Sequence, residues 1–412
     1  MRIAYFLNEF PALSQTFILN QITGMMDRGH EVDIYAKYRF NSDACHPQVE
    51  KYRLLERTRI FSDIPRGGLQ RFGCAIRLIV GRGLWRSPLL LARVLKSWGR
   101  AGEILNLRSI YHVLAFADRP AYDVLHCQFG TLGPLALKLK MLGITDGAIV
   151  TSFRGYDLTR NAERNPRFYR QLFATGAQFL PVSRSLADML LTAGCPEERL
   201  HILHSGIDCS RFRFSARRRE AEQVTKVLSI GRLVEKKGLV YAIEAVANAH
   251  RAGRKLQYTI VGDGALRPQL ESRVEACGIE PLVTFRGWCD HDEVVRLMEQ
   301  SHLLVAPSVT AADGDQEGIP NVAKEAMATG LPVLSTWHGG IPELVENGVT
   351  GYLVPERDVE ALTERLVHFC DEPGAWAGMG ERARAKIEAE FDREQINDEL
   401  ESLYTQVSQV GG

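Results

Sequence analysis

The chain has 412 residues, 45% of them hydrophobic, and its 50 basic and 50 acidic side chains give a formal net charge of zero. This length suffices for a large core in two or three domains, and the balanced charge argues against wholesale nucleic-acid binding. The eight cysteines form no C-x-x-C pair, which argues against a structural zinc site or a disulfide framework and favours a reducing cytosol. The N-terminus lacks the apolar region of a signal peptide, and no window of about 18 uncharged apolar residues predicts a membrane span.

Strand and helix patterns alternate along the chain, which predicts parallel sheets with helices on both faces. In the first half the strand patterns are 2–8, 30–37, 123–129, 148–155, 178–183 and 200–206, and the helix patterns include 14–29 and 184–194. In the second half the strand patterns are 226–233, 257–264, 282–288, 302–308, 331–337 and 351–355, and the helix patterns include 239–253, 266–278 and 292–301. The polar, arginine-rich run 209–225 shows no buried pattern and is the predicted linker. We therefore expect an α/β fold of two doubly wound domains that face each other across a cleft.

One segment, 64–102, interrupts this alternation. It holds eight Arg or Lys residues and no Asp or Glu, interleaved with apolar side chains that include Trp85 and Trp98. A cationic, aromatic-bearing amphipathic pattern is typical of a helix that lies in a membrane interface and is attracted to anionic lipid. The alternative is a helical hairpin whose arginines cover the first domain with their aliphatic stems.

Two motifs of the second half suggest phosphate binding. In "GRLVEKKG", Arg232 lies at a strand end, Lys237 in the loop and Gly238 at a helix start, so two cations lie beside free backbone N–H groups and can hold a diphosphate. Arg and Lys also occur in solvated loops of this kind, which is the alternative. The motif "VGDG", with Gly262 and Gly264, starts like a dinucleotide fingerprint, but Arg267 replaces the third glycine and argues against an NAD site.

The stretch "EGIPNVAKEA" places two carboxylates eight positions apart, at Glu317 and Glu325. Pro320 suits the first turn of a helix, and residues 321–329 read as a short helix that Gly330 ends. Glu317 then lies in a loop at the carboxyl end of a strand, where ligands of open α/β sheets bind. The alternative is two solvated glutamates near a helix start.

Six motifs in order over residues 228–355 resemble the retaining glycosyltransferases of the GT-B fold, family four, also called group 1. They are "GRLVEKKG", "VGDG", "FRGW", "EGIPNVAKEAMATGLPV", "GGIPELV" and "TGYLV". In the first half, "FPALSQTFI", "LHCQFGTLG" and "TSFRGYD" resemble the branch that builds bacterial exopolysaccharides. The resemblance implies an N-terminal acceptor domain over 1–205 with 64–102 as an insertion, a donor domain over 206–390, and a helix over 391–412 that returns to the first domain.

The resemblance also implies roles for individual residues. Glu317 would face the donor sugar and Glu325 the ribose, while Arg232 and Lys237 would neutralise the diphosphate as it leaves, in place of a metal ion. Preorganised cations stabilise such growing charge most strongly in the transition state. The other implied donor contacts are Gly318, Ile319, Pro320, Asn321, Gly262, Gly264, Gly287, Trp288 and Gly340.

In the first half, the chain departs from the family pattern at three places. Ser14 lies where relatives have a glycine pair, and a helix start there still presents N–H groups. The family's His-x-His is His126-Cys127-Gln128 here, and Gln128 can hydrogen-bond a sugar hydroxyl but cannot shuttle a proton. Arg154 replaces a histidine and leaves Asp157 as the nearest carboxylate. We expect Ser14, His126, Arg154 and Asp157 to bind acceptor or sugar; the alternative for the last two is a salt-bridged turn.

The expected function is transfer of a sugar from a nucleotide-diphosphate sugar to a lipid-linked saccharide acceptor, with retention by a front-face mechanism and without metal or other cofactor. The enzyme would work on the cytoplasmic, inner face of an anionic membrane, as a peripheral protein in cell-surface polysaccharide synthesis. Two alternatives are a metal-dependent glycosyltransferase that uses 313–315 as a D-x-D motif, and an inactive nucleotide-sugar-binding module of the same fold.

Overall fold

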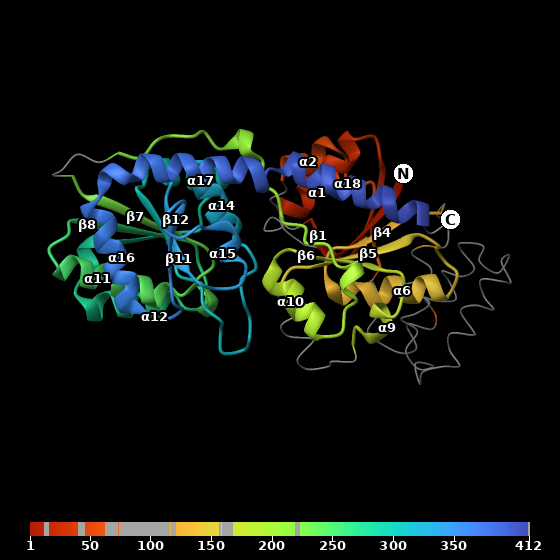
Figure 1. Cartoon of the computed structure of the whole chain (residues 1–412), viewed down its shortest axis with the longest axis horizontal. Helices are drawn as coiled ribbons and strands as arrows, with labels where there is room; N and C mark the ends of the chain where they lie inside the picture. Colours follow the sequence, from red (N-terminus) through yellow and green to blue (C-terminus); the bar gives the residue numbers. More distant parts are fainter. Residues whose placement is uncertain are drawn as a thin grey trace.

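The computed structural model describes residues 1–11, 16–39, 46–61, 73, 116, 121–155, 158, 168–218 and 223–410. These residues form two six-stranded parallel sheets, one in each half of the chain, as the alternating patterns predict (Figure 1). Apart from Gly73, the cationic segment 64–102 lies outside the described residues. Among the helices that the structure describes, none combines the length and apolarity needed to cross a membrane.

The first sheet has the order β3-β2-β1-β4-β5-β6 and the second the order β12-β11-β10-β7-β8-β9. Each half starts at a central strand, builds outward to one edge, and then returns to build the other half-sheet. The strands of the first sheet are β1 (Arg2–Phe10), β2 (Glu31–Arg39), β3 (Thr58–Ile60), β4 (Val124–Cys127), β5 (Ala148–Phe153) and β6 (Gln178–Pro181). Those of the second are β7 (Thr225–Ile230), β8 (Leu256–Val261), β9 (Val283–Gly287), β10 (Leu303–Ala306), β11 (Val333–Thr336) and β12 (Gly351–Val354).

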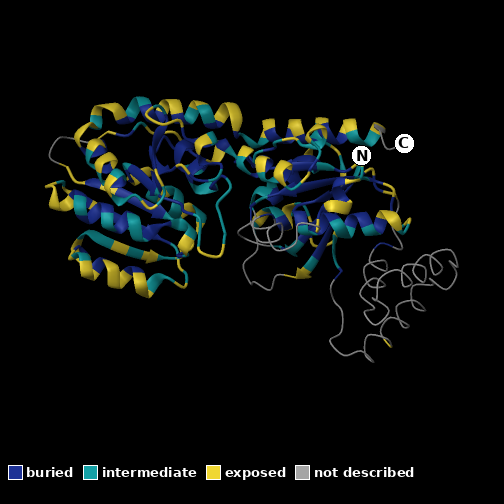
Figure 2. Ribbon diagram, turned by 60° about the horizontal axis from the view of Figure 1, so that its bottom comes forward, coloured by how far each residue is buried: buried dark blue, intermediate teal, exposed yellow. Residues whose placement is uncertain are grey.

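Helices cover both faces of each sheet, so each domain has two apolar layers. Figure 2 shows that most strands are buried while the helices expose their outer faces. The helices of the first half are α1 (Thr16–Asp27), α2 (Pro47–Lys51), α6 (Gly133–Met141), α9 (Arg170–Phe173) and α10 (Arg184–Thr192). Those that follow are α11 (Leu239–Arg251), α12 (Arg267–Cys277), α13 (His291–Gln300), α14 (Asn321–Ala328), α15 (Ile341–Leu344), α16 (Val359–Asp371), α17 (Trp376–Glu390) and α18 (Arg393–Val410).

The chain passes between the domains twice, and the two passages lie side by side. Ile207 accepts a backbone hydrogen bond from Arg393 (2.9 Å) and donates one to Phe391 (2.9 Å). After the second passage, α18 packs against α1 of the first domain (Figure 1), and Arg28, the residue after α1, forms an ion pair with Asp398 of α18 at 2.5 Å. The last helix therefore belongs, by its contacts, to the first half of the molecule.

Two expectations from the sequence are wrong. Residues 200–206 form no regular strand. Leu200 makes a single bridge to Phe179, and His201 and Leu203 donate backbone hydrogen bonds to Phe179 and Pro181 of β6, after which the chain crosses to the second domain. The run 209–225 is not an unburied linker throughout, because Phe212 and Arg217 are buried. Arg217 donates to the carbonyl of Met298 at 3.0 Å, so this run packs on the second domain.

Candidate functional site

The candidate site lies where the strand order of the second sheet reverses. There β7 and β10 are neighbours, although β8 and β9 separate them in sequence. Loops at such a reversal leave a crevice that ligands of open α/β sheets occupy. The loop after β7 carries Arg232, Lys236 and Lys237, and the loop after β10 carries Glu317. A small pocket between the strand ends is lined by residues that include Lys237 and Pro320.

Gly238 allows these two loops to pack together. It follows the 3-10 turn Glu235–Lys237, has a φ of +62° and begins α11 as its N-cap. A Cβ at this position would lie 1.9 Å from the carbonyl oxygen of Pro307, which follows β10. Glycine permits both the left-handed backbone and this approach. The turn that carries Lys237 is thereby held against the loop that leads to Glu317.

Glu317 is ion-paired with two lysines of that turn. Its Oε1 lies 3.1 Å from Nζ of Lys237 and 3.4 Å from Nζ of Lys236, and only 13% of its side chain is exposed. Burial alone would raise the pKa of Glu317, but the two ammonium groups outweigh burial and lower the pKa to about 2. The carboxylate is therefore buried and ionised.

Lys236 was missed by the sequence analysis, which assigned only Lys237 of the pair to the site. Its Nζ also lies 3.2 Å from Oδ1 of Asp315 and donates to the carbonyl of Gln316. Lys236 thus contacts three consecutive residues of this loop, Asp315, Gln316 and Glu317. Asp315, the second acid of the D-x-D alternative, has this lysine as its ion-pair partner. Among the residues that the structure describes, no three His, Cys, Asp or Glu side chains are grouped so as to hold a metal.

Glu325 lies inside α14, which begins at Asn321 after Pro320 as N-cap, close to the helix expected from the sequence. Burial raises the pKa of Glu325, while the charges of Lys324 and Arg211 act in the opposite direction. Within the described part of the chain, its carboxylate has neither a hydrogen-bond nor an ion-pair partner. A half-buried carboxylate has lost part of its hydration, and a ligand hydroxyl that donates a hydrogen bond to it would compensate for that loss.

The expected glycine contacts gather at the ends of β7, β8 and β9. The N–H of Gly262 donates to the carbonyl of Gly287 at 2.7 Å. A Cβ on Gly262 would lie 2.0 Å from the carbonyl of Gly231, and one on Gly264 would lie 2.6 Å from that of Leu233, so these loops pack backbone to backbone. Trp288, which follows β9, is 74% exposed. Arg232, two residues after the end of β7 and five before Lys237, is also exposed.

The backbone around Gly318 and Ile319 packs on the turn after β11. Gly340 donates its N–H to the carbonyl of Gly318 at 2.9 Å. A Cβ on Gly340 would lie 2.6 Å from Cγ1 of Ile319 and 2.7 Å from Cβ of Ser183 in the first domain. The expected donor contacts Gly318, Ile319 and Gly340 therefore form one unit that reaches the boundary between the domains.

The candidate residues of the first domain are His126 in β4, Gln128 directly after β4, and Arg154 directly after β5. Arg154 donates through Nε to the carbonyl of Gln128 at 3.1 Å and through Nη2 to the side-chain oxygen of Gln128, and its guanidinium stacks on Phe17 at 4.3 Å. Gln128 is fully buried. His126 is also fully buried, with its ring nitrogens bonded to Tyr404 and Ser152. Burial, then the charge of Arg154, lowers the pKa of His126 well below its usual range.

The structure therefore arranges these residues in layers. Arg154 is only partly buried, whereas Gln128 and His126 lie beneath it. Ser14 and Asp157 lie outside the described residues. A Cβ on Gly155 would lie 3.4 Å from the carbonyl of Gln316, so the end of β5 meets the loop of Glu317 across the domain boundary.

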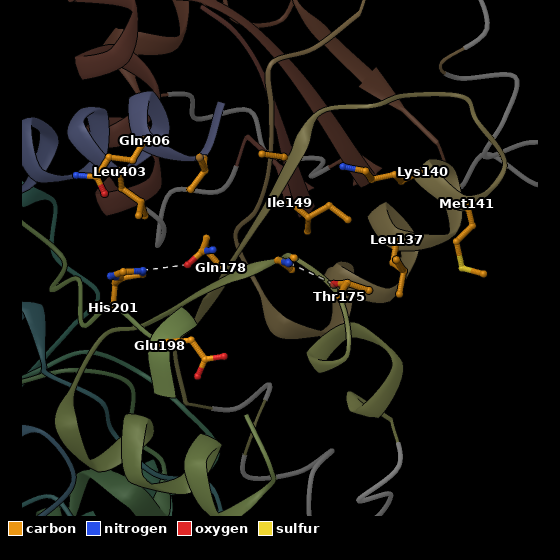
Figure 3. Close-up of a pocket in the computed structure, with 14 residues that line it drawn as sticks. Leu137, Lys140, Met141, Ile149, Thr175, Gln178, Glu198, His201, Leu403 and Gln406 are labelled. Carbon is orange, nitrogen blue, oxygen red and sulfur yellow. Dashed lines mark hydrogen bonds between the residues drawn. The ribbon is translucent and has the colours of Figure 1, made fainter. Parts of the chain in front are cut away.

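A separate cavity of about 560 Å³ lies at the opposite ends of β5 and β6 (Figure 3). Its lining is largely apolar and includes Leu137, Met141 and Ile149, together with Leu403 from α18. Ala148 and Gln178, the first residues of the two strands, also line it. Because the candidate site lies at the carboxyl ends of the strands, this cavity is not part of it.

Comparisons with known proteins identify the family of this chain. Residues 210–386 match the family described as "Glycosyl transferases group 1", and residues 14–211 match "Glycosyltransferase Family 4". The colanic acid biosynthesis glycosyltransferase WcaL of Escherichia coli K12 is 38% identical, over 98% of this chain and 99% of its own. The amylovoran biosynthesis glycosyltransferase AmsK of Erwinia amylovora is 35% identical, over 95% of this chain and 96% of its own.

Solved structures show the same fold. HepE of Anabaena, in complex with UDP, superposes with a TM-score of 0.72 at 19% identity, over 98% of this chain and 100% of its own. Sucrose-phosphate synthase of Thermosynechococcus elongatus gives a TM-score of 0.69 at 19% identity, over 100% of both chains. The GT-B fold of two Rossmann-like domains, expected from the motifs, is thus confirmed. Together with the two family matches and the full-length similarity to WcaL and AmsK, this shows that the chain belongs to the group 1, or family 4, glycosyltransferases.

Proposed function

We propose that this glycosyltransferase moves a sugar from a nucleotide-diphosphate sugar to a saccharide acceptor during exopolysaccharide synthesis. The observation that carries the proposal is the buried, ionised Glu317 between Lys236 and Lys237 at the switch point of the second sheet. The names of WcaL and AmsK, which refer to colanic acid and amylovoran biosynthesis, support the process. Structures of HepE with UDP and with UDP-glucose support the donor class.

In this proposal, positive charge on the β7 loop takes the role of a metal ion. Lys237 leaves Glu317 to bind the diphosphate, and the exposed Arg232 closes on the same group. Lys236 remains beside Glu317 and balances its charge. As the bond from the sugar to the phosphate breaks, negative charge grows on the leaving phosphate, and cations already in place stabilise it.

Glu317 and Glu325 divide the donor between them. Glu317 accepts hydrogen bonds from hydroxyls of the transferred sugar, and Glu325, which has no partner among the described residues, accepts those of the ribose. The loops that carry Gly262, Gly264 and Gly287 contact the nucleotide, and the exposed Trp288 offers a surface to the base. Gly318, Ile319, Pro320, Asn321 and Gly340 line the sugar and the distal phosphate.

Transfer proceeds with retention on the front face of the sugar. The acceptor oxygen bonds to the anomeric carbon on the face that the phosphate leaves, and the acceptor proton passes to the leaving phosphate. Arg154, bonded to Gln128, binds the acceptor from the first domain, and Ser14 and Asp157 complete this side. His126 is fully buried and bonded to Tyr404 and Ser152, so it supports this side without touching the acceptor. The acceptor is lipid-linked, and segment 64–102 holds the enzyme on the inner, anionic face of the membrane.

Isothermal titration against UDP-, GDP- and ADP-sugars tests the donor, and NMR of the product tests the stereochemistry. We expect micromolar-range binding of one donor and the same anomeric configuration in donor and product. A product of inverted configuration would contradict the front-face mechanism. A chain that binds none of the panel would contradict the proposed donor class.

A further inference from the structure

A buried histidine holds the backbone of Glu317. His338, in the turn after β11, is 1% exposed, and its Nε2 lies 3.0 Å from the backbone nitrogen of Glu317. A backbone N–H can only donate, so Nε2 must accept this bond. The contact joins two loops separated by 21 residues and by the whole of α14 and β11. It is made to the residue whose carboxylate lies at the centre of the proposed donor site.

The other ring nitrogen of His338 is held by a carboxylate. Nδ1 lies 2.6 Å from Oε1 of Glu356, a residue that follows β12. The second oxygen of Glu356 accepts the N–H of Thr310 at 2.8 Å, from the loop after β10. Burial alone would raise the pKa of Glu356, but the Thr310 N–H, His338 and Arg357 outweigh burial and lower the pKa. Glu356 is therefore an ionised acceptor that fixes both the ring and the loop beneath it.

These two contacts define the protonation state of the ring. Nε2 accepts from Glu317, so it carries no proton, and Nδ1 must donate to the carboxylate of Glu356. His338 is then a neutral imidazole with its proton on Nδ1. A second proton on Nε2 would place two donors face to face and remove the bond to Glu317.

The contact controls geometry more than folding, because other contacts hold the same turn. Gly340 donates to the carbonyl of Gly318 at 2.9 Å, and Ile341 donates to the carbonyl of His338 at 3.0 Å. Gly339 has a φ of +52°, and a Cβ there would lie 2.2 Å from the carbonyl of Glu317. The turn thus has other contacts besides the imidazole, whereas among the described residues only Nε2 of His338 accepts the N–H of Glu317.

We propose that His338, oriented by Glu356, is a positioning residue that sets the backbone of Glu317 and so aims its carboxylate at the transferred sugar. This inference rests on the proposed function of Glu317 in the donor site. A displacement of about 1 Å at a reacting centre can cost on the order of 10²-fold in rate. Loss of the contact should therefore reduce kcat while the nucleotide, held elsewhere, still binds.

Two variants of nearly equal size separate the two contacts of the ring. His338→Gln keeps an acceptor at the position of Nε2, and His338→Asn keeps a donor toward Glu356 but does not reach Glu317. With the tightest-binding sugar nucleotide of the panel as donor, we expect His338→Asn to lower kcat about tenfold or more with little change in KM. His338→Gln should retain most of the wild-type kcat. Equal kcat values for the two variants, whether both normal or both low, would overturn the proposal.

Glu356→Gln covers the case in which His338→Asn does not fold. An amide cannot accept from both Thr310 and Nδ1, so the ring loses its orientation and kcat should fall as for His338→Asn. A wild-type kcat in Glu356→Gln would contradict the role of this carboxylate. An inactive wild type would overturn the proposed function and this inference together, whereas an active wild type with an unchanged Glu356→Gln variant would overturn the inference alone.

Discussion

Glu317 combines burial with a full charge because two ammonium groups lie within 3.4 Å of it. Its pKa in the folded chain, about 2, lies below that of an unfolded glutamate. The ion pairs therefore stabilise the fold fully above roughly pH 4.3, and this contribution is lost as the pH falls toward 2. Across the neutral range Glu317 remains ionised and can act only as an acceptor, never as a proton donor.

The two glutamates should respond differently to truncation. Glu317→Ala removes an acceptor that faces the reacting sugar, so we expect kcat to fall more than KM changes. If Glu325 binds the ribose as proposed, Glu325→Ala removes a contact that is the same in ground and transition states, so KM should rise with kcat nearly constant. Steady-state kinetics and donor titration measure both effects. Small and equal effects at both positions would favour two solvated glutamates near a helix start.

The lysine and arginine of the β7 loop predict catalysis without added metal. Activity should survive EDTA, and Lys237→Ala and Arg232→Ala should each lower kcat about 10²-fold or more, because each removes a charge that stabilises the leaving phosphate. Exposed Lys226→Ala provides the control, since this residue lies at the opposite end of β7. Loss of activity in EDTA with recovery in Mn²⁺ would instead favour the D-x-D alternative.

At the scale of elements, much of the second domain was predictable. Its six strands and the helices α11, α12 and α13 follow apolar patterns that the sequence shows, and Glu317 and Lys237 follow adjacent strands of the sheet. The partners within the site were not predictable. "EKKG" offers two lysines, and the geometry of the 3-10 turn directs both of them to Glu317. His338 meets Glu317 only because β11 returns beside β10, which spacing along the chain does not reveal.

In the first domain, the sequence pattern predicted that a ligand could reach His126 and Gln128, but both side chains are fully buried. His126 lies inside β4 and Gln128 directly follows it, and α18 packs against β4 and brings Tyr404 to His126. The apolar pattern at 200–206 was also misleading, because Gly206 packs against Cα of Arg393 at the passage between the domains. Both errors arise from contacts between segments about 190 to 280 residues apart.

Helix α14 also carries a buried lysine that ties it to the passage between the domains. Nζ of Lys324 donates to the carbonyl of Ser205 at 2.5 Å and to its hydroxyl at 2.7 Å. Burial, against the opposing effect of Glu325, lowers the pKa of Lys324 to about 7. Because this pKa is depressed, the charged amine destabilises the fold below pH 7, and that cost disappears as the pH rises toward about 10.4.

The linkage predicts a pH-dependent difference between two lysine variants. The free energy of unfolding of wild type should rise relative to that of Lys324→Met by up to about 1.4 kcal/mol per pH unit above neutrality. Lys226→Met, at an exposed lysine, should keep the wild-type slope. Urea unfolding at several pH values measures these slopes. Parallel slopes for wild type and Lys324→Met would show that Lys324 keeps an ordinary pKa.

On the scale of the whole molecule, the two halves are joined tightly on one side. The two passages pair through Ile207, and Asp208 binds Arg393 at 2.9 Å. Near the candidate site, Glu343 of the second domain accepts the N–H of Arg184 at 2.7 Å, at the start of α10. The loop of Glu317 therefore faces the first domain at fixed contacts, and we expect the proposed acceptor to bind on the side of β4 and β5, where Arg154 lies.

If the acceptor is lipid-linked, the cationic segment 64–102 would bring the enzyme to the membrane that carries it. This segment belongs in sequence to the first domain, between β3 and β4, and thus to the half that carries Arg154. Its eight cations and two tryptophans contrast with a net charge of zero for the chain. Near an anionic surface each basic residue contributes roughly 1 kcal/mol, so several together bind a membrane reversibly.

Membrane binding should therefore depend on lipid charge and on salt. We expect wild type to sediment with anionic but not neutral liposomes, and salt to weaken this binding because the Debye length is only about 8 Å at physiological ionic strength. Charge reversal within the segment should release the protein and leave donor hydrolysis intact, whereas reversal of four exposed arginines in the second half should release it far less. The first set is Arg77, Arg82, Arg86 and Arg93, and the matched control set is Arg251, Arg273, Arg286 and Arg296. If wild type ignores anionic liposomes at low salt, the arginines cover the first domain instead, and a membrane-bound acceptor must be recognised without this segment.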